Sequence, residues 1–165
     1  IINFYVAPVT RWEFLLGKQL PYVALGVLNM ILMTIVAVVF IDVPIKGSFL
    51  TLMIGATLFV IFATGIGFFI SAFVRTQIAA LFATMIATII PIVQYAGLIN
   101  PVTSLEGPGA FFGRIYPATH MLIISRGVFN KALGLADLRY EFIPLALSVP
   151  VILILAVLFL PRQER

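Results

Sequence analysis

The fold is decided at the start of the chain, where residues 1–18 read IINFYVAPVTRWEFLLGK and residues 19–41 read QLPYVALGVLNMILMTIVAVVFI. The first stretch mixes aromatic with charged side chains, which is typical of a helix lying at a membrane surface. Thr10 and Glu13 have the spacing of a capping box. After Lys18 no charge follows for 23 residues. We therefore expect residues 1–18 to form an interfacial helix that leads into a membrane span.

The composition of the whole chain supports a membrane protein. Of its 165 residues, 62% are hydrophobic and 10% are charged, and the mean hydropathy is +1.20. Soluble domains carry about 25% charged residues. The net charge of +4 does not indicate nucleic-acid binding, because the basic residues are scattered between apolar runs. The chain contains no cysteine, which excludes disulfides and thiolate chemistry. It starts with isoleucine and shows no signal peptide, so we expect a fragment of a longer membrane protein.

Four uncharged runs are long enough to cross the hydrocarbon core as helices, which takes about 20 residues. We predict spans at residues 19–41, 49–73, 78–99 and 142–161. Helices are expected because lipid leaves no partner for unpaired backbone groups, and the runs lack the alternation of a barrel strand. The predicted fold class is all-α, a single polytopic domain over residues 1–165.

Residues 100–141 are predicted to form an extracytoplasmic connector. Residues 100–109 read NPVTSLEGPG, which is strong turn chemistry. The apolar piece at 118–129 has an uncharged core, Ile115–Ser125, of only 11 residues. That length is too short to span and favours a re-entrant or interfacial segment.

The side on which the ends lie is argued from positive charge. Four spans place both ends on one side, and the ten Lys and Arg residues divide equally between the two sides. The basic residues on the side of the ends sit close to span boundaries, which favours cytoplasmic ends.

Small side chains recur every four residues on two of the predicted spans. Ala63, Gly67 and Ser71 form one such stripe on the second span. The third span carries two, one of Ala79, Ala83 and Ala87 and a weakly polar one of Ala80, Thr84 and Thr88. This spacing allows close helix packing inside one bundle. Alternatively, one stripe lines a pathway or a dimer interface.

Most catalytic chemistry is missing from the sequence. Nothing resembles a complete phosphate-binding or dinucleotide-binding loop, and a single histidine with no cysteine predicts no metal cluster. No carboxylate lies well inside a span, so a proton relay has no candidate. An enzyme is therefore disfavoured.

The polar residues that remain each have two interpretations. His120 and Arg126, within the short apolar piece, either face the interface and pair with Glu106 or a backbone carbonyl, or face a substrate exit. Arg11 and Glu13 either form a solvated helix face or dock a soluble partner.

Several strings, in this order, resemble the permease subunit of type-2 ABC exporters of the bacterial drug or small-molecule kind. Residues 7–18, APVTRWEFLLGK, are similar to the cytoplasmic coupling segment of that family, and residues 95–101, YAGLINP, to the end of its fifth span. Tyr116-Pro117, His120 and residues 124–127, ISRG, resemble its re-entrant region. The resemblance covers nearly the whole chain.

This resemblance implies a six-span permease of which the chain is the C-terminal part, in the bacterial inner membrane with cytoplasmic ends. A separate or fused ATPase would bind ATP and magnesium, and a second permease half would complete the pathway; the chain itself would hold no cofactor. The implied coupling residues are Pro8, Arg11 and Glu13, the pathway candidates are Thr84, Thr88, Gln94 and Tyr95, and the exit candidates are Tyr116, His120 and Arg126. The alternatives are a membrane scaffold without transport and an ion-coupled transporter, although no inverted repeat is visible.

Overall fold

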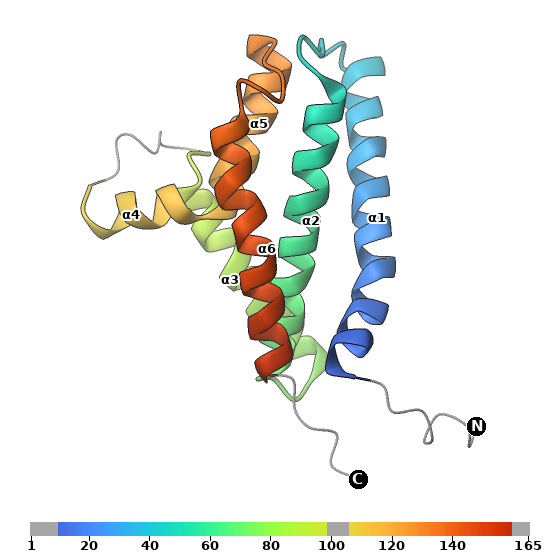
Figure 1. Ribbon diagram of the computed structural model, residues 1–165, viewed down its shortest axis with the longest axis vertical. Helices are drawn as coiled ribbons and strands as arrows, with labels where there is room; N and C mark the ends of the chain where they lie inside the picture. The colour runs from blue at the N-terminus through green and yellow to red at the C-terminus, as the bar shows by residue number, and fades with distance from the viewer. Residues whose placement is uncertain (1–9, 99–105, 160–165) are drawn as a thin grey trace.

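The computed structural model describes residues 10–98 and 106–159, and every regular element in these residues is a helix (Figure 1). The elements are α1 (Arg11–Val39), α2 (Phe49–Ser71), α3 (Gln77–Tyr95), α4 (Pro108–Ile115), α5 (Pro117–Lys131) and α6 (Arg139–Phe159). Four of them, α1, α2, α3 and α6, are long and apolar enough to cross a membrane. The all-α prediction with four spans is confirmed.

The start of α1 differs from the prediction. Thr10 caps the helix with the expected capping box to Glu13, but the helix then continues unbroken to Val39. Residues 11–18 are therefore the first turns of the same continuous helix that contains the predicted span 19–41, not a separate helix. No residue between them and Pro21 stops a helix, and Pro21 removes only one backbone hydrogen bond. Residues 1–9, including Pro8, lie outside the described part of the chain.

Two other span boundaries also shift. The third span was predicted to end at residue 99, but α3 ends at Tyr95 and is followed by Gly97 in a left-handed conformation with φ +82°. The last span was predicted from residue 142, but α6 begins at Arg139. The predicted bounds followed the ends of the uncharged runs. A helix can extend into charged residues, as α6 does at Arg139, or end inside an uncharged run, as α3 does at Tyr95.

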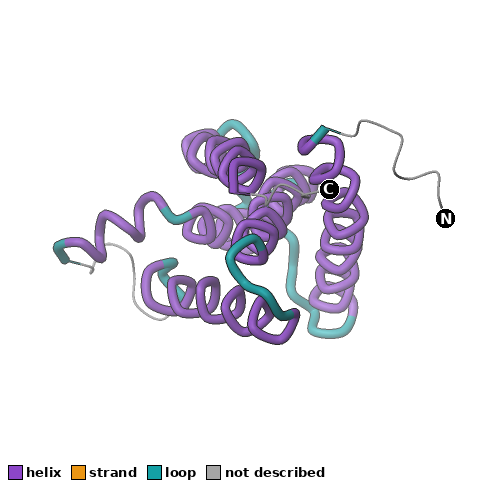
Figure 2. The backbone as a smooth tube through the Cα atoms, turned by 90° about the horizontal axis from the view of Figure 1, so that it is seen from below, coloured by secondary structure: helices purple, strands orange, loops and turns teal. Residues whose placement is uncertain are grey.

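The helix α2 is the centre of the bundle. It contacts α1, α3, α5 and α6, and Figure 2 shows the helices of the bundle from below. The main core forms where α2, α5 and α6 meet, and its buried residues are Leu52, Ala56, Met121, Ile124, Val128, Leu138 and Leu145. The resulting packing fixes the short helix α5 against two spans.

A smaller core joins the start of α1 to the end of α6. Leu15, which is 1% exposed, packs with Ala156 and Val157. Phe68 and Phe69 of α2 lie against this cluster. Accordingly, α1 begins and α6 ends at the same end of the bundle, at the bottom of Figure 1, as an even number of spans requires.

The close contact between α2 and α6 lies off the predicted small-residue stripe. A Cβ at Gly65 would lie 2.9 Å from Cγ2 of Ile152 on α6, whereas a Cβ at Gly67 would meet nothing within 4 Å. Gly65 therefore permits the close approach of α2 and α6. The stripe Ala63, Gly67 and Ser71 is not the one that lets these two helices approach.

The connector contains two short helices where the sequence predicted one short segment. Helix α4 runs across the direction of the spans, and α5 follows it after Tyr116 (Figure 1). With 15 residues, α5 is about 22 Å long, too short to cross a core of about 30 Å. One face of α5 is buried, including His120 and Ile124.

Candidate functional site

The predicted coupling residues lie in the first turn of α1. The Glu13 carboxylate accepts hydrogen bonds from the Thr10 backbone N–H at 2.8 Å and from the Thr10 hydroxyl at 2.9 Å. These bonds, the backbone one first, hold the pKa of Glu13 below its ordinary value of 4.5. Glu13 precedes the uncharged part of α1, and its carboxylate is committed to capping. Arg11 is exposed beside it.

One and two turns further on, α1 is fixed to two other helices. Leu15 is buried against α6, and the Gln19 side-chain amide donates to the Ile61 carbonyl at 2.9 Å and to the Thr64 hydroxyl at 3.0 Å on α2. Gln19 is 3% exposed. Gln19 was not predicted as a contact residue, although it is the first residue of the uncharged run and a buried glutamine needs a hydrogen-bond partner.

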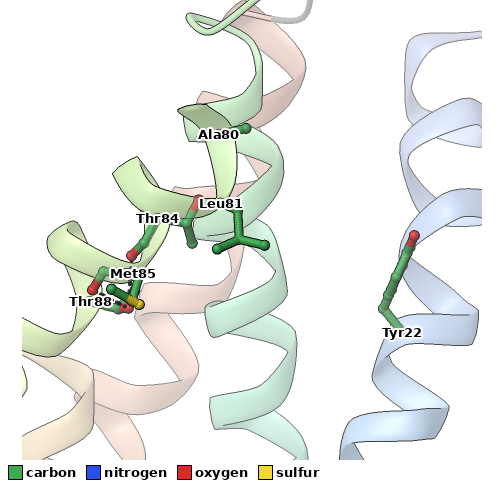
Figure 3. A pocket seen from close by; sticks show the side chains of 6 residues that line it. All are labelled: Tyr22, Ala80, Leu81, Thr84, Met85 and Thr88. Carbon is green, nitrogen blue, oxygen red and sulfur yellow. Dashed lines mark hydrogen bonds between the residues drawn. The ribbon is translucent and has the colours of Figure 1, made fainter. Parts of the chain in front are cut away.

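Two of the predicted pathway residues line a groove. An open groove of about 610 Å³ has one wall of five α3 residues and faces Tyr22 of α1 (Figure 3); the α3 residues are Ala80, Leu81, Thr84, Met85 and Thr88. None of the six carries a charge. The Thr88 hydroxyl donates to the Thr84 carbonyl at 2.8 Å, which satisfies it within the helix. The groove therefore presents a largely apolar surface.

The groove coincides with one of the two small-residue stripes predicted on the third span, the weakly polar one. Ala80, Thr84 and Thr88 recur every four residues, and their small size leaves room between α3 and Tyr22. Tyr22 itself packs edge-on against Phe68 of α2, with ring centroids 6.0 Å apart. No described residue of α3 is buried, so this helix packs on α2 with the rest of its surface uncovered.

The other two pathway candidates lie elsewhere. Gln94 is exposed at the end of α3, and the Tyr95 ring lies 6.2 Å from the ring of Phe112 on α4. They do not line the groove. A link between the regions comes from Tyr116, whose hydroxyl donates to the Thr88 carbonyl at 3.4 Å. Burial raises the pKa of Tyr116 from its ordinary value of 10.0, so its hydroxyl stays a donor at neutral pH.

Two of the predicted exit residues, His120 and Arg126, also lie in different surroundings. His120 is buried and contacts Glu141 of α6 and the carbonyl of Arg114 at the end of α4. The expected carbonyl partner is present, but the carboxylate is Glu141 and not the predicted Glu106. Arg126 is exposed on α5. Spacing along the sequence could not identify Glu141, because 21 residues separate it from His120.

Among the residues that the structure describes, no group of three His, Cys, Asp or Glu side chains is placed to hold a metal ion. The features that the structure brings together are an anchored helix start, an uncharged groove and a buried polar contact in the connector.

The comparisons with known proteins bear on the whole chain. The model of the family described as "ABC-2 family transporter protein" matches residues 2–158. The chain belongs to this family. It is 32% identical over 152 residues to the probable multidrug ABC transporter permease YbhS of Escherichia coli strain K12, and equally to its counterpart in Escherichia coli O157:H7. These matches cover 92% of this chain and 36% of each relative, so the chain spans about a third of their length. No solved structure matches the chain significantly.

Proposed function

We propose that this chain forms part of the permease of an ATP-driven exporter in the bacterial inner membrane, with both ends of the chain in the cytoplasm. A separate or fused ATPase binds ATP and magnesium, and a second permease half completes the pathway. Membership of the ABC-2 family and the resemblance to a probable multidrug permease support this proposal.

The observation that carries the mechanism is the anchorage of α1. Arg11 is exposed, Leu15 is buried against α6 one turn later, and Gln19 is bonded to α2 one turn after that. A force applied at the start of α1 therefore reaches two other spans directly. In the proposed mechanism the ATPase contacts the segment containing Pro8, Arg11 and Glu13 when it closes on ATP. This contact favours one of two arrangements of the spans.

The proposed pathway includes the groove beside α3. Its uncharged walls, with Thr84 and Thr88, suit a small drug-like or lipophilic molecule better than an ion. Tyr22 lies on α1, so movement of α1 would change the width of the groove. Gln94 and Tyr95 would lie nearer the outer mouth, where the end of α3 meets α4.

In this account α4 and α5 form a re-entrant pair at the outer side of the membrane. Tyr116 links the pair to the groove through the Thr88 carbonyl, and His120 links it to α6. Arg126, exposed on α5, would meet the aqueous exit.

The proposal is tested by purifying the complete parent protein in detergent and assaying the preparation for a copurifying or fused ATPase. We expect Arg11→Glu to leave membrane insertion intact and to lower permease-stimulated ATP hydrolysis about tenfold, since a reversed charge at a docking contact costs more than about 1.4 kcal/mol. Arg11→Lys, which keeps the charge, is the matched control.

Two outcomes would count against the proposal. Normal coupling in Arg11→Glu would remove Arg11 from the contact with the ATPase. If no ATPase associates with the parent protein, the family resemblance describes the fold alone, and a scaffold without transport becomes the better interpretation.

A further inference from the structure

His120 joins three elements of the connector and the last span. Its Nδ1 lies 2.6 Å from Oε2 of Glu141 in the first turn of α6, and its Nε2 lies 2.9 Å from the carbonyl oxygen of Arg114 in the last turn of α4. The side chains of His120 and Glu141 are 10% and 27% exposed. The final carbonyls of a helix lack partners within it, so the Arg114 carbonyl needs such a donor.

Both contacts can be hydrogen bonds only if the pair of His120 and Glu141 holds one proton more than a neutral imidazole and an ionised carboxylate carry together. A carbonyl oxygen and an ionised carboxylate are both acceptors, and a neutral imidazole carries only one N–H. With a neutral ring and an ionised carboxylate, one ring nitrogen would therefore point a lone pair at an oxygen lone pair. Both contacts become hydrogen bonds if the ring is an imidazolium or if the carboxyl group of Glu141 is protonated.

We propose that His120 and Glu141 form a proton-binding site, and that the shared proton fastens α5 to α6 and to the end of α4. The ligand of this site is a proton taken from the aqueous phase. When the proton leaves, one of the two contacts becomes repulsive and the start of α5 loosens. The proposal concerns the connector and does not depend on an ATPase partner.

The surrounding elements offer the proton no other carboxylate. Helix α2 contains no ionisable side chain, and α3 contributes only Tyr95, which lies against Phe112. Asp137, before α6, accepts from the Gly134 backbone N–H at 2.9 Å. The remaining ionisable groups of α4, α5, their junction and α6 are Arg114, Tyr116, Arg126, Lys131, Arg139 and Tyr140.

Those remaining groups are either exposed or bonded elsewhere. The side chains of Arg114, Arg126 and Lys131 are exposed. The guanidinium of Arg139 donates to the Tyr140 hydroxyl at 3.0 Å. Within the described residues, His120 and Glu141 are the only acidic and basic side chains that lie within salt-bridge distance of each other. The excess proton is therefore assigned to this pair.

A matched variant separates proton binding from simple packing. In Glu141→Gln the amide N–H can donate to a neutral Nδ1 while Nε2–H donates to the Arg114 carbonyl, so every contact is satisfied without an extra proton. We expect this variant to keep the link between the helices and to lose its dependence on pH. His120→Ala removes the link at every pH.

The first measurement is backbone hydrogen exchange of residues 118–124 in the complete parent protein, corrected for the intrinsic pH dependence of exchange. We expect wild-type protection to be about tenfold higher at the acidic end of a range of pH values than at its alkaline end, because the shared proton is present at one end and absent at the other. Protection in Glu141→Gln should stay constant over this range. Identical pH profiles in the wild type and Glu141→Gln would overturn the proposal.

A second measurement needs no variant to remain folded. At the pH where this protection is highest, we expect nitrogen-15 NMR to show either both His120 ring nitrogens protonated, or a neutral ring accompanied by the infrared band of a protonated carboxylic acid. The His120 signals are assigned by their absence in His120→Ala, and the infrared band by its absence in Glu141→Gln. A neutral ring beside an ionised carboxylate would refute the proposal.

Discussion

At the scale of single residues, Glu13 shows why a charged side chain near a membrane need not be a docking group. Its carboxylate accepts two hydrogen bonds from Thr10 and completes the capping box. The first backbone N–H groups of a helix have no partner within it, so the hydrogen bonds between Thr10 and Glu13 stabilise the start of α1. Arg11 takes no part in the capping box and remains the stronger candidate for contact with an ATPase.

The capped state gives Glu13 a pH dependence with a definite sign. Because hydrogen bonds lower the pKa of its folded form below 4.5, its contribution to stability is present above that value and is lost as the pH falls through the folded pKa. We expect an NMR titration of the Glu13 carboxyl carbon to give a midpoint below 4.5, and Thr10→Ala to raise it part of the way back, because the backbone bond remains. An unchanged midpoint in Thr10→Ala would contradict the assigned cause.

At the scale of elements, the contact between α2 and α6 depends on one glycine. Gly65 faces Ile152, which approaches so closely that even a methyl group would have to displace it. Gly67 lies two residues further along the same helix and has open space around it. The two positions form a natural matched pair.

We expect Gly65→Ala to lower the free energy of unfolding by about 1–3 kcal/mol, the usual cost of overpacking a tight contact. Gly67→Ala should be neutral or should stabilise by up to about 1 kcal/mol, because alanine is the better helix former. Thermal unfolding of both variants in the same detergent checks this. Equal destabilisation by the two substitutions would show that the α2–α6 contact is not as tight as described.

At the scale of the whole molecule, the sequence predicted the features that depend on long uncharged runs or on local spacing. Length and lack of charge identified the four spans, and the Thr10–Glu13 spacing identified the cap. Both signals lie within short stretches of sequence, so they can be recognised without knowing how the helices pack. The period-four stripe on α3 likewise marked Thr84 and Thr88, which line the groove.

What the sequence could not predict depends on contacts between distant residues. Glu141 meets His120 only because α5 and α6 fold back on each other, and Gln19 finds Ile61 only because α1 packs on α2. Helix α4 was missed because its glycines and proline read as a turn. The continuity of α1 was missed because a change in composition at Lys18 is not a break in the backbone.

The central claim is that an ATPase acting at the start of α1 moves the wall of the groove. The most direct test places spin labels at Tyr22→Cys and Leu81→Cys, on the two sides of the groove, in the complete parent protein freed of any other cysteine and assembled with its ATPase. This account predicts that trapping ATP changes the distance between the labels by at least about 2 Å, and that Arg11→Glu abolishes the change. A label distance that is the same with and without trapped ATP would contradict it.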